Sequence, residues 1–227
     1  MRGSQCVFCE AEDAPTMDHV PPQSFFPPKL PSNVEMVSAP SCYACRDATM
    51  KTDGTLRNLF VSTEDAERHP VVIESLLGKR DRSFEHRALN VTELMKLMKK
   101  VERHSPGGIY LGEDWAFDFN NPLMDAFAER LARALLWYEF KESFFKGSFG
   151  WRMNLGFPEI FYENMRKFGR LRKVHDIFAY GIVGFSEDKP AWIVADFFGC
   201  TELFIRAEKE PNSSLNDSPS VVEKNSP

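Results

Sequence analysis

Apolar residues at helical spacing mark one long buried segment in the middle of the chain. Between residues 122 and 145, Leu123, Phe127 and Leu131 recur four positions apart, which places them on one face of an α-helix. Asn121 stands just before a proline, and this is the usual order of a helix cap and first helical residue. We therefore predict a core helix over residues 122–145.

The preceding region is richer in charge and also has helix signals. Thr63 precedes acidic residues that suit the positive end of a helix, and Asn90 and Glu93 stand at the spacing of a capping box. An amphipathic face follows, made by Leu94, Leu97, Met98 and Val101. The pattern predicts helices between residues 63 and 104.

Toward the end of the chain the pattern favours strands. Residues 173–207 contain apolar runs rich in β-branched and aromatic residues, broken by a short polar turn at 186–190. Such runs predict antiparallel strands of a small sheet. From residue 208 the chain is rich in Ser, Pro and Asn, and it has too few apolar residues to fold. We expect residues 208–227 to be a disordered tail.

The N-terminal region carries the strongest chemical signal, because four of its cysteines form two Cys-x-x-Cys pairs. These are Cys6 with Cys9 and Cys42 with Cys45. Two such pairs present four thiolates in the tetrahedral arrangement that suits Zn²⁺. Disulfides and a redox motif are the alternatives, but no βαβ pattern surrounds either pair. The spacing indicates a structural zinc site.

An Asp-His dipeptide lies between the two cysteine pairs and is followed by two prolines. Neighbouring residues on a strand point to opposite faces, so Asp18 and His19 can approach one phosphodiester from two sides. A carboxylate can hold a divalent cation while an imidazole deprotonates water. The dipeptide is thus a candidate catalytic pair.

The order Cys-x-x-Cys, Asp-His-Val-x-Pro, Cys-x-x-Cys resembles the zinc-bound HNH, or ββα-metal, endonucleases. The matching residues are Cys6, Cys9, Asp18, His19, Val20, Pro22, Phe25 or Phe26, Val37, Pro40, Cys42, Cys45 and Asp53. The resemblance implies a hairpin and a helix that hold one catalytic metal ion. It further implies that His19 is the general base, that Asp18 is a metal ligand and that the four cysteines bind structural zinc.

One position departs from that family, which places Asn or His directly after the last cysteine as a metal ligand. Here the residue is Arg46, and a guanidinium has no lone pair for a cation. Asp47 or Asp53 can supply the missing oxygen to Mg²⁺ or Mn²⁺. Alternatively, Arg46 grips the substrate phosphate, or the site binds nucleic acid without cutting it.

Composition adds limits on compartment and partners. The chain has 227 residues, a net charge of −5 and 20 Phe. It has no apolar run long enough to cross a membrane and no N-terminal signal region, so we expect a cytoplasmic protein. One basic strip is a candidate for contacts with a nucleic-acid backbone. It consists of Arg166, Lys167, Arg170, Arg172 and Lys173.

These features together predict an α+β fold. Residues 1–61 are expected to form a zinc-bound ββα-metal, treble-clef-like module, and residues 62–207 an accessory α+β domain that positions the substrate or a protein partner. The predicted function is metal-dependent endonuclease activity on nucleic acid, with DNA as the first choice of substrate. The alternatives are a degenerate zinc-stabilised module that binds nucleic acid or protein, and a phage or defence regulatory factor.

Overall fold

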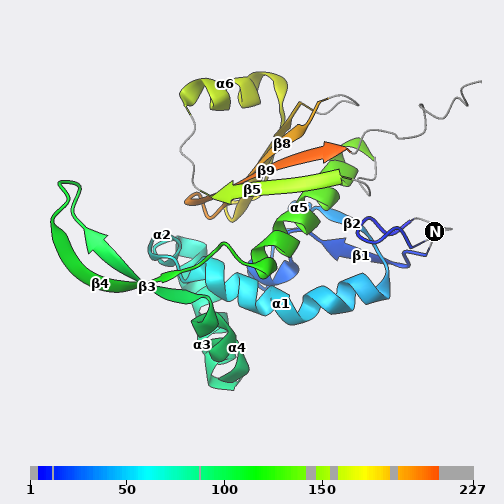
Figure 1. Ribbon diagram of the computed structural model, residues 1–227. Helices are drawn as coiled ribbons and strands as arrows, with labels where there is room; N and C mark the ends of the chain where they lie inside the picture. Colours follow the sequence, from blue (N-terminus) through cyan, green and yellow to red (C-terminus); the bar gives the residue numbers. More distant parts are fainter. Residues whose placement is uncertain are drawn as a thin grey trace, which may run out of the picture.

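The computed structural model of the chain describes residues 5–11, 13–86, 88–141, 147–153, 158–184 and 189–209. It is an α+β fold with antiparallel sheets, as the sequence predicts. A two-stranded sheet and a long helix form the N-terminal part, a second two-stranded sheet projects from the body, and a five-stranded sheet closes the fold (Figure 1).

The N-terminal part consists of strand β1 (Thr16–His19), the 3-10 turn η1 (Gln23–Phe25), strand β2 (Ser38–Ser41) and helix α1 (Tyr43–Val61). The two strands are antiparallel, with Asp18 opposite Ala39 and His19 opposite Ser38. Strand β2 leads almost directly into α1, so this hairpin and this helix are joined by a single residue, Cys42, which caps the helix.

After α1 come the short helices α2 (Glu64–Glu67), η2 (Val72–Leu76), α3 (Leu77–His86) and α4 (Ala88–Lys96). The prediction of helix as far as residue 104 is wrong at its end, because strand β3 (Met98–His104) pairs with β4 (Tyr110–Phe117). Cross-strand ion pairs, Lys100 with Glu113 and Arg103 with Asp114, stabilise this ribbon. The apolar residues at helical spacing predicted a helix here, but residues 98–104 instead pair with a strand that the sequence did not predict.

Helix α5 (Pro122–Phe140) confirms the predicted core helix, but it ends at Phe140, before the predicted end at residue 145; residues 142–146 lie outside the described part. The side chain of Asn121 accepts hydrogen bonds from the backbone N–H groups of Leu123 and Met124, at 3.0 and 3.1 Å. At the other end of α5, the C-cap residue Lys141 has a left-handed backbone conformation.

The five-stranded sheet has the order β5-β9-β8-β7-β6 and is antiparallel throughout. Its strands are β5 (Gly147–Met153), β6 (Arg170–His175), β7 (Phe178–Val183), β8 (Ala191–Phe197) and β9 (Thr201–Lys209). Helix α5 lies against one face and helix α6 (Glu159–Phe168) against the other (Figure 1). The predicted tail begins within β9, and residues 210–227 are outside the described part.

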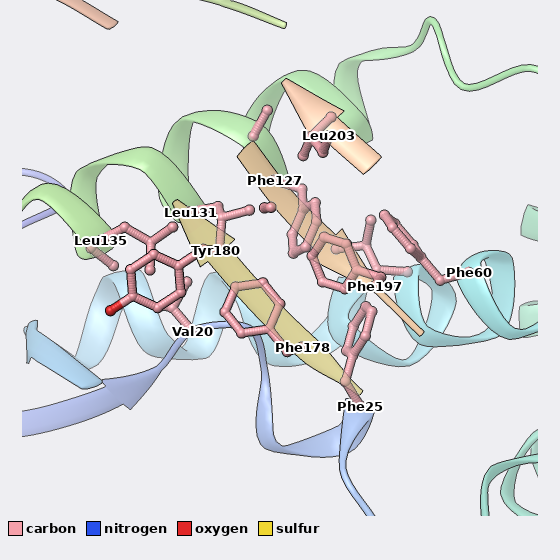
Figure 2. Close-up of a cluster of buried hydrophobic side chains, with 14 of the residues drawn as sticks. Val20, Phe25, Phe60, Phe127, Leu131, Leu135, Phe178, Tyr180, Phe197 and Leu203 are labelled. Carbon is pink, nitrogen blue, oxygen red and sulfur yellow. The ribbon is translucent and has the colours of Figure 1, made fainter. Parts of the chain in front are cut away.

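One hydrophobic cluster joins the N-terminal hairpin and helix to α5 and the sheet. Five phenylalanine rings from η1, α1, α5, β7 and β8 meet at its centre, as Figure 2 shows: Phe25, Phe60, Phe127, Phe178 and Phe197. The rings of Phe60 and Phe197 have centroids only 4.7 Å apart. The predicted N-terminal module and the predicted accessory domain thus share this core. No helix in the described part of the chain has the length and apolar character needed to cross a membrane.

Candidate metal site and carboxylate cluster

The four paired cysteines come together at the start of helix α1. The Sγ atoms of Cys6, Cys9, Cys42 and Cys45 all lie within 4.8 Å of one another, and the four thiols are free. Four sulfurs bound to one zinc ion at about 2.3 Å stand ~3.8 Å apart in a tetrahedron. The spacing between the Sγ atoms of Cys9 and Cys42 is 3.6 Å. The cluster therefore fits a tetrahedral zinc ion, and the zinc ligands that the sequence predicted are brought together.

Local backbone bonds hold this arrangement. The N–H of Val7 donates to the carbonyl of Pro40 at 3.0 Å, which ties the first cysteine loop to β2. The N–H of Cys45 donates to the sulfur of Cys42 at 3.4 Å, and this bond lowers the pKa of the Cys42 thiol to about 7. A thiol with a lowered pKa is readily deprotonated, as a metal ligand must be.

A second cluster brings together two of the predicted catalytic carboxylates around an arginine. Arg130 of α5 donates from Nη2 to Asp18 Oδ2 at 2.6 Å and from Nη1 to Asp53 Oδ1 at 2.8 Å. Asp18 lies on β1 and Asp53 on α1, so three elements meet at this guanidinium. The side chains are only 12%, 17% and 8% exposed for Asp18, Asp53 and Arg130. They form a buried ion-pair triad.

In this triad one positively charged guanidinium faces two carboxylates. Burial raises the pKa of Asp53, and the nearby positive charge of Arg130 acts in the opposite direction. The Nε atom of Arg130 is buried, and the described residues offer it no hydrogen-bond acceptor. The guanidinium also lies 6.0 Å from the ring centroid of Phe8, in the first cysteine loop. The triad thus links the hairpin, both long helices and the zinc cluster.

The contacts of the predicted ligands do not suit a catalytic Mg²⁺ or Mn²⁺ ion. Carboxylate oxygens are the right kind of ligand, but the facing oxygens of Asp18 and Asp53 already bind a guanidinium. Asp47, the third predicted ligand, is 65% exposed and lies 3.7 Å from the Nε atom of Arg46. Within the described residues the four cysteines are the one grouping of three or more possible metal ligands. This arrangement does not fit a divalent ion between Asp18 and Asp53.

His19 ends β1 and faces away from its neighbour Asp18, as alternation along a strand requires. Its ring is partly buried, and Nδ1 has no hydrogen-bond partner among the described residues. Arg46, on the first turn of α1, lies with its guanidinium carbon 5.3 Å from the ring centroid of Tyr43. The side chain of Arg46 therefore contacts Tyr43 and Asp47 of the same helix.

Four members of the predicted basic strip form ion pairs with acidic side chains. Arg166 pairs with Glu159, and Lys173 Nζ lies 2.7 Å from Asp176 Oδ1. Both Arg170 and Arg172 contact Glu139, at 3.6 and 3.7 Å. Lys167 lies 5.2 Å from the ring centroid of Phe168. These acidic partners offset the positive charge of the basic strip, which the sequence alone does not reveal.

Sequence reasoning missed Arg130, because the helical spacing of residues 122–145 led to the whole segment being read as core. One signal was available: arginines at positions 130 and 133 lie within a helix predicted to be core. Lys and Arg are rarely buried unless they are paired. Arginines in a predicted core helix therefore call for carboxylate partners: Arg133 pairs with Glu129 of the same helix, and Arg130 with Asp18 and Asp53 from distant parts of the chain.

A separate cavity of about 310 Å³ lies between α6 and the outer face of the five-stranded sheet. Its lining includes Met165, Val194 and the side chains of two acids from neighbouring strands, Asp196 and Glu202. Burial, and then the charge of Glu202, raises the pKa of Asp196 to about 6.

Comparison of the chain with protein-family models, with curated proteins and with solved structures finds no match.

Proposed function

We propose that this protein is an endonuclease of HNH type that hydrolyses phosphodiester bonds in nucleic acid, with DNA as the first substrate to test. One arrangement carries the proposal. A cysteine cluster that fits zinc joins a hairpin to a helix, and the hairpin's Asp18 approaches Asp53 of the helix through a single guanidinium. This order of parts supports the proposal of a treble-clef-like, ββα-metal module.

In this proposal His19 is the general base that takes a proton from the attacking water. Its Nδ1 atom is buried and has no hydrogen-bond partner among the described residues, so the proton would be taken at Nε2. A general base of this kind contributes about 10²–10⁴-fold to a rate. The family resemblance makes Asp18 a ligand of a catalytic Mg²⁺ or Mn²⁺ and Asp53 a candidate second ligand, but the facing oxygens of both carboxylates bind Arg130 instead.

The test is nicking of supercoiled plasmid by the zinc-loaded protein in the presence of Mg²⁺ or Mn²⁺. We expect His19→Ala to lower the rate by about 10²-fold or more. His175→Ala is a matched control, because His175 is also partly buried and its Nδ1 also has no partner in the described part of the chain. Equal nicking rates for His19→Ala and His175→Ala would contradict the proposed nuclease mechanism. Failure of the wild type to cleave DNA or RNA would contradict it as well.

The triad itself favours a second function. A module whose carboxylates are neutralised by Arg130, and whose Arg46 replaces a ligand, suits binding of nucleic acid or a protein partner without cleavage. The predicted outcome for this alternative is a gel shift with DNA or RNA that needs no divalent ion and leaves the substrate intact.

A further inference from the structure

The cavity between α6 and the outer face of the five-stranded sheet has the size and lining of a small-molecule site. Its volume of about 310 Å³ lies at the lower end of the range for ligand pockets. Met165 of α6 and Val194 of β8 line it together with Ala179 and Gly181, which stand two positions apart on β7. The two small residues leave room between helix and sheet. A concave, mostly apolar lining with a few polar groups is typical of ligand binding.

Two carboxyl groups form the polar part of this cavity. Asp196 of β8 stands directly opposite Glu202 of β9 in the sheet, and both line the cavity. Like charges in directly opposite positions destabilise a sheet. Glu202 accepts a hydrogen bond from the hydroxyl of Tyr162 at 2.8 Å, whereas the buried Oδ1 atom of Asp196 has no hydrogen-bond partner among the described residues. A positive charge beside these two acids would therefore stabilise them.

The basic side chains that line the cavity are held in other ion pairs. Each pairs with an acid outside the lining: Lys173 with Asp176, Arg166 with Glu159, and Arg172 with Glu139. Lys173 also lowers the pKa of Asp196, but burial and the charge of Glu202 act on that pKa more strongly and raise it. The lining thus leaves the two neighbouring carboxyl groups short of positive charge.

We propose that this cavity binds a small organic amine, with the ammonium group beside Asp196 and Glu202 and the apolar part against Met165 and the small residues of β7. An ammonium group donates charge-assisted hydrogen bonds to carboxylates and offsets the repulsion between the two acids. The apolar part of the ligand gains free energy by leaving water. The inference goes beyond the proposed nuclease and does not depend on it, because α5 with Arg130 covers the opposite face of the sheet (Figure 1).

The test is an NMR titration of the zinc-loaded full chain, labelled with ¹⁵N, at neutral pH and without nucleic acid. Three probes share one aromatic body and differ in the polar group: phenethylamine, 2-phenylethanol and phenylacetate. We expect phenethylamine to bind about tenfold or more tightly than 2-phenylethanol, and to shift the backbone signals of Ala179, Gly181 and Asp196. Phenylacetate should bind more weakly than either, because it would add a third negative charge to the cavity.

Three variants assign the binding to this cavity. Asp196→Asn should weaken phenethylamine about tenfold and leave 2-phenylethanol unchanged. Ala179→Leu, or Ala179→Val if the leucine variant does not fold, should weaken both probes because it fills the cavity. The matched control is Asp114→Asn, which removes an exposed acid of the β3–β4 ribbon that pairs with Arg103, and it should bind as the wild type does.

Four results would overturn the inference. They are no binding of phenethylamine at millimolar concentration, equal affinities for the amine and the alcohol, a preference for phenylacetate, and amine binding that Asp196→Asn or the Ala179 variant leaves unchanged. Cleavage is not measured, so a protein that never cuts nucleic acid can still bind the amine, and an active nuclease can fail to bind it.

Discussion

The buried triad predicts that the effect of Asp53→Asn on the free energy of unfolding depends on whether Arg130 is present. In the wild type, Asp53 accepts a charged hydrogen bond of 2.8 Å from Arg130, worth about 1.5–3 kcal/mol, and this bond opposes the burial that raises the pKa of the carboxyl. In Arg130→Met, the carboxylates of Asp18 and Asp53 are left buried without their cation. Removing one of them there should stabilise the protein.

The magnitudes follow from the burial of the three side chains. Breaking a buried ion pair by deleting one partner costs about 3–5 kcal/mol, which applies to Arg130→Met because its side chain is 8% exposed. For a chain of this length each kcal/mol shifts Tm by roughly 2–4 °C, so Arg130→Met should lower Tm by about 6–20 °C. The coupling between positions 130 and 53 should be about 2 kcal/mol or more.

The assay is a double-mutant cycle of thermal or urea unfolding, followed by circular dichroism at neutral pH with zinc present and no other divalent ion. Arg133→Met with Glu129→Gln is the reference cycle. Glu129 is 45% exposed, so that coupling should stay below about 1 kcal/mol. If Asp53→Asn destabilises the wild type and Arg130→Met equally, the triad does not exist in solution.

Two further predictions concern other parts of the fold. The pKa of Asp196 is raised to about 6, so the stability that this carboxyl contributes is present below its unfolded pKa of about 4 and is lost as pH rises to about 6. Asp196→Asn should therefore stabilise the protein more at pH 7.5 than at pH 5, by about 1 kcal/mol once solvent screening of this half-exposed group is included, and an equal effect at both pH values in urea unfolding would contradict this. Asn121→Ala should cost about 1 kcal/mol in the same assay, because Asn121 caps α5 with two hydrogen bonds; no loss would mean that the cap does not contribute.

The zinc ligands and the core helix could be predicted from sequence because their signals are local. The spacing within each cysteine pair fixes where two thiolates point, and the cap at Asn121 marks the start of α5. Apolar residues four apart likewise identify a buried helix face without knowledge of the partner it packs on. Local chemistry was enough for these elements.

The strand β3 and the triad were missed because both depend on partners distant in sequence. Residues 98–104 carry helical spacing, yet they pair with a strand whose own residues, 110–117, gave no prediction. The role of Arg130 depends on two acids more than seventy positions away. The same limit applies to the basic strip, where Glu139 from α5 meets Arg170 and Arg172 only in the folded chain.

The most direct measurement of the central claim is X-ray absorption at the zinc edge of the purified full chain, together with its metal content. A zinc-stabilised hairpin and helix predicts one zinc per chain with four sulfur neighbours at about 2.3 Å, and loss of that zinc in Cys42→Ser. Zinc bound by nitrogen or oxygen, or a folded chain that carries no metal, would contradict it.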